Sequence, residues 1–192
     1  MNTVQPIRDI KDIDHMKRVL KDIHPKYEML FALGINTGLR VSDLLALRVS
    51  DIKGKDHVTI NEQKTGKRKR FLINKPLQKE LNKYTKMSGL KDDDLLFPGN
   101  SKPPKEEGKK SKAGQISRIQ IYRVLNDAAQ KCGLDEIGTH TMRKTFGFHF
   151  YKRTHDVAML MDIFNHSAPS ITLRYIGITD SQKDEALEHF YL

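Results

Sequence analysis

The sequence contains a single cysteine and no long apolar run among its 192 residues. Cys132 has no cysteine to pair with, which excludes an internal disulfide and a zinc site built from cysteines. Its place in a helical pattern of apolar residues indicates a buried structural thiol rather than a nucleophile. No stretch approaches the about 18 consecutive apolar residues of a membrane span, and the N-terminal residues lack the apolar core of a signal peptide. We therefore expect a cytoplasmic protein without a membrane anchor.

Motifs that bind metal ions or nucleotides are also missing. The sequence has no carboxylate cluster like that of a two-metal nuclease. It has no glycine-rich phosphate loop followed by Lys-Ser or Lys-Thr. We therefore expect no metal ion, nucleotide or other cofactor.

Acidic residues are outnumbered by basic ones. The chain has 34 Lys and Arg against 24 Asp and Glu, a formal net charge of +10. This excess favours a polyanionic partner such as nucleic acid. Charge alone does not decide the matter, because ribosomal, heparin-binding and many other soluble proteins are equally basic.

The hydrophobic pattern predicts a mainly α-helical fold with a small antiparallel β-sheet, which is an α+β class. Residues 57–60 and 70–73 have strand character, and turn-forming residues separate them, so we expect a hairpin or a three-stranded sheet with Lys64 near its tip. Ser42 is expected to cap a short helix. Helices are predicted at 10–23, 27–35, 43–47, 76–87, 117–131, 139–151, 155–164 and from Pro169 through Tyr175.

Two segments differ from this pattern. Residues 98–115 are rich in proline, glycine and lysine, and we expect a mobile loop there because the segment cannot bury enough apolar surface to offset its ordering entropy. Residues 179–192 begin with capping-box spacing and predict a C-terminal helix. This helix could dock on its own core or on a neighbouring protomer.

Three short segments carry the candidate functional residues. The segment TGLRVSD contains Arg40, THTMRKT contains His140 and Arg143, and NHSAPSITLRY contains His166 and Tyr175. Together they resemble the catalytic boxes of the tyrosine recombinases, the phage-integrase family of site-specific DNA recombinases. The match extends over most of the chain.

This resemblance implies that the chain cleaves and rejoins double-stranded DNA through a 3′-phosphotyrosyl intermediate, without metal or ATP. Tyr175 would attack phosphorus. Arg40 and Arg143 would bind the non-bridging oxygens, because planar guanidinium groups bind them bidentately and charge grows there during displacement. His166 would donate a hydrogen bond to the same phosphate, and His140 could assist as acid or base.

The resemblance also assigns roles around the predicted hairpin. Lys64 would protonate the departing 5′-oxygen as general acid, and Asp43 looks like the family's acidic partner that orients the first arginine. Several other cations are expected to contact DNA phosphates. These are Lys67, Arg68, Lys69 and Lys144.

The chain departs from the family pattern in a few places. Phe164-Asn165 stands where many members have Leu-Gly, and Lys144 stands where His or Arg is frequent. Family members usually carry a separate helical core-binding domain before the catalytic one, whereas residues 1–192 are expected to form a single catalytic domain. We expect either a minimal recombinase or a fragment of a longer integrase, and Met1 with the first helix favours the former.

Alternatives to this reading stay open. The chain could be a catalytically weak DNA-binding module that regulates a full-length integrase, or a relaxing topoisomerase of the related tyrosine class. As a recombinase it is expected to be a monomer in solution, a tetramer on DNA and nucleoid-associated when bound. Accessory recombination proteins are further candidate partners.

Overall fold

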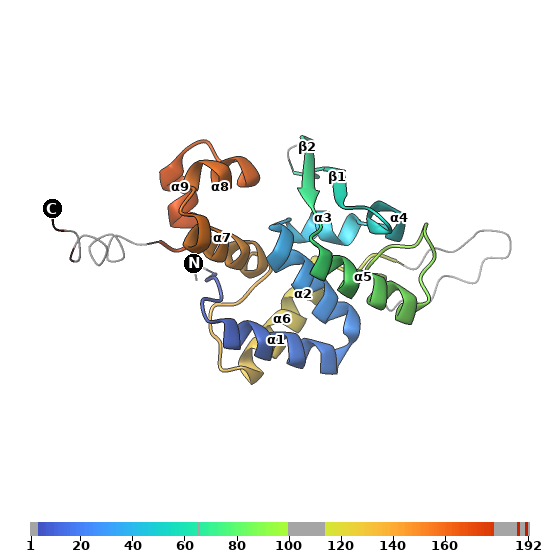
Figure 1. Cartoon of the computed structure of the whole chain (residues 1–192). Helices are drawn as coiled ribbons and strands as arrows, with labels where there is room; N and C mark the ends of the chain where they lie inside the picture. The colour runs from blue at the N-terminus through green and yellow to red at the C-terminus, as the bar shows by residue number, and fades with distance from the viewer. Residues whose placement is uncertain (1–3, 65, 100–113, 179–187, 189–190, 192) are drawn as a thin grey trace.

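The computed structural model describes residues 4–64, 66–99, 114–178, 188 and 191. These residues form nine helices and one two-stranded antiparallel sheet (Figure 1), which confirms the mainly helical α+β class. The helices are α1 (Ile10–Ile23), α2 (Pro25–Thr37), α3 (Val41–Ala46), α4 (Val49–Ile52), α5 (Lys75–Ser88), α6 (Arg118–Lys131), α7 (Thr141–Thr154), α8 (Val157–Phe164) and α9 (Pro169–Tyr175).

The sheet is a hairpin, which decides between the two predicted arrangements. Strands β1 (His57–Asn61) and β2 (Arg68–Leu72) pair from His57 opposite Leu72 to Asn61 opposite Arg68. Lys64 lies in the connection between them, as predicted. No helix in the described part of the chain is long and apolar enough to cross a membrane.

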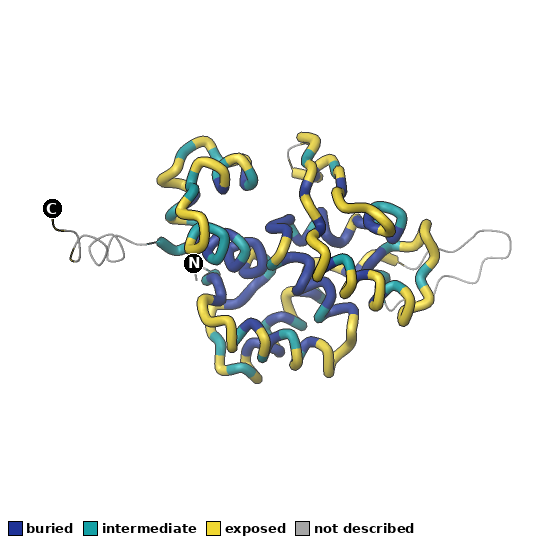
Figure 2. The backbone as a smooth tube through the Cα atoms, in the orientation of Figure 1, coloured by how far each residue is buried: buried dark blue, intermediate teal, exposed yellow. Residues whose placement is uncertain are grey.

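Helix α2 lies at the centre of the main core. It packs against α1, α5 and α7, so residues on nearly all of its faces are buried (Figure 2). Helix α1 is amphipathic instead and buries one stripe, Ile13, Met16 and Leu20. Cys132 caps the end of α6 and is half-buried against this core, in keeping with a structural thiol.

Helix α7 connects the main core to a second apolar cluster. Its Met142 belongs to the main core, whereas its Phe148 packs in the second cluster with Leu160, Phe164 and Ile176. Gly147 allows the close approach, since a Cβ there would lie 2.7 Å from the Phe164 ring and 2.6 Å from Ile176. The second cluster therefore fixes α8 and α9 against α7, and the third predicted box consists of the turn between them and α9.

The structure corrects the predicted start of one helix and adds a short helix that was not predicted. Helix α3 begins at Val41 with Arg40 as its N-cap, so Ser42 lies inside the helix and does not cap it. The extended backbone of Arg40 (φ −70°, ψ 148°) starts the helix earlier than the Ser-Asp signal suggested. Helix α4 was not predicted, because four residues are too few to show periodicity. The predicted loop 98–115 and C-terminal helix 179–192 lie almost wholly outside the described residues.

Gly38 ends α2 in a conformation that few other residues adopt. Its φ is +65°, and its N–H donates to the carbonyl of Gly34. A Cβ at this position would lie 2.5 Å from the Phe146 ring on α7. Gly38 is thus required by backbone conformation and by helix packing together.

We expect Gly38→Ala to lower the free energy of unfolding by at least about 2 kcal/mol, combining left-handed strain with overpacking against Phe146. Gly54→Ala is the matched control: Gly54 has φ +68° but no neighbour within 4 Å of a new Cβ. Its loss should be about 1 kcal/mol from strain alone. Urea unfolding of both variants measures the difference, and equal losses would show that the Phe146 contact is unimportant.

Candidate active site

Arg143 is buried and held by main-chain acceptors. Its residue is 2% exposed, Nη1 donates to the Gly38 carbonyl at 2.6 Å and Nη2 to the Phe164 carbonyl at 2.9 Å. The guanidinium also lies 4.2 Å above the Phe164 ring. Because an arginine has five N–H donors, these bonds fix its plane and leave further donors for a ligand.

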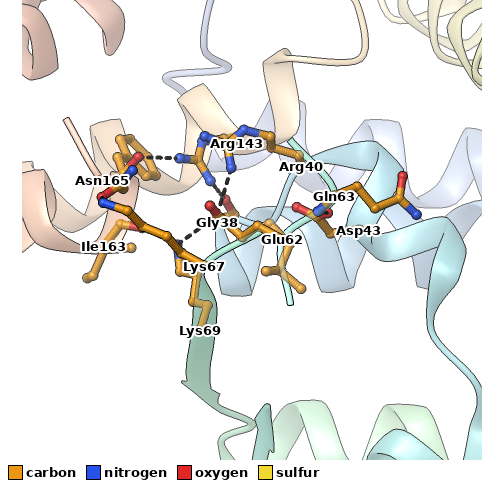
Figure 3. A network of polar contacts seen from close by, with 12 residues as sticks. Gly38, Arg40, Asp43, Glu62, Gln63, Lys67, Lys69, Arg143, Ile163 and Asn165 are labelled. Carbon is orange, nitrogen blue, oxygen red and sulfur yellow. Dashed lines mark hydrogen bonds and ion pairs between the residues drawn. The ribbon is translucent and has the colours of Figure 1, made fainter. Parts of the chain in front are cut away.

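Arg40 pairs with Glu62 and not with the predicted Asp43 (Figure 3). Arg40 Nη1 lies 2.7 Å from Glu62 Oε1, in an ion pair without hydrogen-bond geometry. Asp43 is buried, and its Oδ1 accepts instead from the N–H of Gln63 at 3.0 Å. Asp43 therefore anchors the hairpin loop, and the carboxylate that contacts Arg40 comes from that loop.

Candidate cations from two of the three boxes and from the hairpin loop share one cleft. A cleft of about 690 Å³ is lined by Arg40, Lys64, His140 and Arg143, together with Arg118 at the start of α6. Arg40 and Arg143 are far apart in the sequence, and the packing of α2 against α7 brings them together. Within the hairpin loop Lys64 faces this cleft.

Tyr175 contacts the cleft through His140. Its hydroxyl lies 3.2 Å from His140 Nδ1, and its ring packs edge-on against Phe164 and His166 at centroid distances of 5.5 and 5.3 Å. The ammonium of Lys144 lies 5.2 Å from the ring centroid. Burial raises the pKa of the Tyr175 phenol, against the opposing effect of Arg143 and Arg40. The phenol is thus protonated at neutral pH and needs a base to become a nucleophile.

His140 can serve as that base. The residue is the N-cap of α7 and keeps an exposed edge. Partial desolvation lowers the pKa of its imidazole, and the nearby charges of Arg143, Lys144 and Arg40 lower it further. The ring is therefore neutral at pH 7, and Nδ1 is able to accept the hydroxyl proton of Tyr175.

His166 is oriented by a turn and a buried threonine. Asn165 ends α8 in the left-handed region (φ 53°), a conformation that Asn tolerates and that the family's more frequent Gly would also adopt. His166 Nδ1 lies 3.0 Å from Oγ1 of the fully buried Thr172 on α9. This contact leaves Nε2 as the nitrogen available to a phosphate. Burial, then Arg143 and Arg40, lower the pKa of His166.

Residues 9–182 match the model described as Phage integrase family. The chain belongs to the phage integrase family. Its fold and family are those of the site-specific tyrosine recombinases, the class of enzymes that cleave and rejoin DNA.

Relatives within this family differ in length. The chain is 46% identical over 191 residues to the probable integrase/recombinase YoeC of Bacillus subtilis (strain 168), covering 99% of this chain and 98% of that protein. It is 28% identical over 161 residues to tyrosine recombinase XerA of Pyrococcus furiosus, covering 83% of this chain and 53% of XerA. The chain therefore spans nearly all of the first relative and about half of the second.

Solved structures show the same fold. A crystal structure of XerA recombinase superposes with a TM-score of 0.75 at 18% identity, over 99% of this chain and 68% of the other. A λ integrase tetramer bound to a Holliday junction gives a TM-score of 0.69 at 14% identity, over 91% of this chain and 49% of the other.

Two of the four residues predicted to contact DNA, Lys69 and Lys144, are partly or fully buried. Lys69 is half-buried, with Nζ 3.7 Å from Glu62 Oε1 and bonded to the Ile163 carbonyl. Burial, followed by the charge of Arg143, lowers the pKa of Lys69 to about 8. Strand alternation explains the placement, because Lys69 shares the inward face of β2 with Phe71.

Lys144 is the second interior lysine. It is 8% exposed, and its Nζ donates to the Val4 carbonyl at 2.7 Å. This placement favours a packing role over the predicted contact with DNA. The other two predicted residues, Lys67 and Arg68, are exposed, although Lys67 Nζ also bonds to Asn165 Oδ1 at 2.9 Å.

Sequence reasoning missed Glu62 and Thr172. Glu62 had one available signal: it is the single acidic residue in the otherwise basic run 62–70. Thr172 had none, because its contact to His166 depends on how α9 packs beside the end of α8. In the described part of the chain, no group of three or more His, Cys, Asp or Glu side chains is arranged to hold a metal ion.

We expect protonation of His140 to lower the free energy of unfolding as the pH falls. Its folded-state pKa is lowered, so below about pH 6.5 the unfolded chain binds a proton that the folded chain binds less readily. The free energy of unfolding should therefore fall as the pH drops through this region. His140→Gln should lose less stability than the wild type between pH 7.5 and 5.5 in urea unfolding. His57→Gln, at an exposed position on β1, is the control; an unchanged acid loss in the His140 variant would contradict the assignment.

Proposed function

We propose that this chain cleaves and rejoins double-stranded DNA at specific sites, with Tyr175 as the nucleophile. One observation carries the proposal: the Tyr175 hydroxyl lies 3.2 Å from the neutral His140, beside a cleft lined by Arg40, Arg143 and Lys64. A phenol, a base and fixed cations are the groups that a metal-free attack on a phosphodiester requires.

In the proposed cleavage step, Tyr175 Oη forms a bond to phosphorus as its proton passes to His140 Nδ1. The bond from phosphorus to the 5′-oxygen breaks, and Lys64 donates a proton to that oxygen. Arg40, Arg143 and His166 Nε2 bind the non-bridging oxygens, where charge grows. The products are a 3′-phosphotyrosine and a free 5′-hydroxyl, and attack by a 5′-hydroxyl in the reverse direction rejoins the strand. The covalent bond conserves the energy of the phosphodiester, so no ATP is consumed.

The names of the relatives support this proposal. The relatives are called integrases or tyrosine recombinases, and one solved neighbour is XerH bound to its difH substrate before cleavage. The λ integrase tetramer on a Holliday junction supports a further proposal, that this chain forms a tetramer on DNA. For the free protein we propose a monomer. The complete set of phosphate-binding and proton-transfer side chains favours an enzyme over a regulatory binding module.

Tyr175→Phe should abolish covalent attachment to DNA because it removes only the nucleophilic oxygen. The measurement is gel detection of a protein–DNA adduct with a suicide substrate, nicked so that the released 5′ fragment diffuses away. The reaction is run in EDTA, since the proposed step uses no metal. Tyr191→Phe, at a residue that is 97% exposed, should still form the adduct. Adduct formation by Tyr175→Phe would falsify the assignment of the nucleophile.

Arg40→Ala and Arg143→Ala should each slow cleavage by at least about a hundredfold, as is typical when one transition-state donor is lost. Duplex affinity should change far less, because many lysines share it. Single-turnover cleavage and filter binding measure the two effects. Arg143→Lys keeps the charge but not the planar fork, and covers the case in which the alanine variant does not fold. Arg153→Ala, exposed on the same helix, should match the wild type; a parallel fall in binding and cleavage would make the arginines affinity contacts only.

A further inference from the structure

Glu62 is a buried carboxylate at the start of the hairpin loop. It follows β1 directly, is 2% exposed, and lies 2.7 Å from Arg40 Nη1 and 3.7 Å from Lys69 Nζ (Figure 3). Burial of a charged carboxylate is unfavourable unless cations or donors compensate it. Arg40 and Lys69 are the cations that compensate the charge of Glu62.

The main chain of Glu62 closes the loop that carries Lys64. Its N–H donates to the Lys67 carbonyl at 3.0 Å, and its carbonyl accepts from the Gly66 N–H at 2.8 Å. Gly66 has φ +67°, which lets the chain turn back toward β2. The main chain of Glu62 at one end of the loop is thus bonded to Gly66 and Lys67 at the other end.

The side chains tie the same loop to the first turn of α3. Glu62 contacts Arg40, the N-cap of α3, and the next residue, Gln63, donates its N–H to Asp43 Oδ1 on that helix at 3.0 Å. Lys64 follows Gln63 in the chain, so its backbone position is set by two consecutive contacts. Arg40 and the Lys64 loop are therefore held in a fixed relation through Glu62 and Asp43.

We propose that Glu62 is a positioning residue that couples Lys64, the proton donor to the 5′-oxygen, to Arg40, the ligand of the phosphate. This inference rests on the proposed function. Glu62 touches neither substrate nor leaving group; it orients the guanidinium and holds the loop so that both meet the same scissile phosphate. If Glu62 only neutralised nearby positive charge, its substitution would slow cleavage equally whether or not the leaving group needs a proton.

The test compares two suicide substrates that differ in one atom. In the first the scissile phosphate has its natural bridging 5′-oxygen, and in the second a 5′-sulfur, whose thiolate departs without a proton. Glu62→Gln keeps the side-chain shape and removes the charge. With the oxygen substrate we expect cleavage to slow on the order of tenfold or more, part of the 10²–10⁴ that a general acid contributes. With the sulfur substrate most of that loss should disappear, and duplex affinity should be unchanged with both.

Reference variants calibrate the result. Lys64→Ala should be rescued by sulfur in the same way, and Arg40→Ala should not be, because its defect lies in phosphate binding. Asp92→Asn, which removes the carboxylate of an exposed ion pair with Lys53, should behave as the wild type. An equal loss on both substrates in Glu62→Gln would overturn the coupling. A wild-type protein inactive on both substrates would instead overturn the proposed function.

A second measurement is independent of catalysis. The amide protons of Gln63 and Gly66 are bonded to Asp43 and Glu62, so their hydrogen exchange reports how firmly the loop is held. Both should exchange faster in Glu62→Gln than in the wild type, and exchange rates that stay the same would refute the proposal. If Glu62→Gln does not fold, Glu62→Asp, which keeps the charge but shortens its reach, is taken through both measurements.

Discussion

The gathering of positive charge at Arg40, Lys69 and Arg143 is the constraint on which the rest of this structure depends. Burial lowers the pKa of Lys69, and Arg143 and Arg40 lie close enough for their charges to lower it further. Two unit charges about 4 Å apart repel by about 4 kcal/mol at an effective dielectric constant of 20, which is a large part of a domain's stability. The fold compensates this repulsion in two ways: main-chain carbonyls accept from Arg143, and a buried carboxylate pairs with Arg40.

Helix α7 holds Arg143 in place within this group of positive charges. One part of the helix belongs to the main core through Met142, and another packs with Phe164 and Ile176 through Phe148 and Gly147. A helix fixed on both sides cannot shift without disturbing two apolar clusters, so the guanidinium of Arg143 stays between them. The same packing brings α9, and with it Tyr175, to the N-cap of α7. Apolar contacts thus place the helices that carry Arg143 and Tyr175, and polar contacts then orient the side chains.

Local signals in the sequence predicted most of the fold. Pro25 and Gly38 bound α2 because proline suits a first turn and glycine the left-handed C-cap, and both rules depend only on neighbouring residues. The start of α3 was misplaced, since the conformation of Arg40 follows from tertiary contacts. The ion-pair partner of Arg40 could not be predicted from the sequence either. Asp43 is near Arg40 along the chain, whereas Glu62 reaches Arg40 only once the hairpin folds back. The interior placement of Lys69 could have been read from strand alternation, whereas that of Lys144 depends on an N-terminal segment distant in sequence.

The opposite pKa shifts at Tyr175 and His140 bear on the order of events in the proposed cleavage step. Burial keeps the phenol protonated and helps keep the imidazole neutral, so the resting pair is joined by a hydrogen bond between uncharged groups. A phosphate in the cleft would offset the arginine charges that favour a phenolate, which makes the free phenolate still less accessible when DNA is bound. Proton transfer to His140 is therefore best timed with attack on phosphorus, when the phenolic oxygen loses its charge to the forming bond. Without a correctly placed phosphate, Tyr175 then stays a neutral phenol. Its oxygen becomes nucleophilic only as it attacks that phosphate.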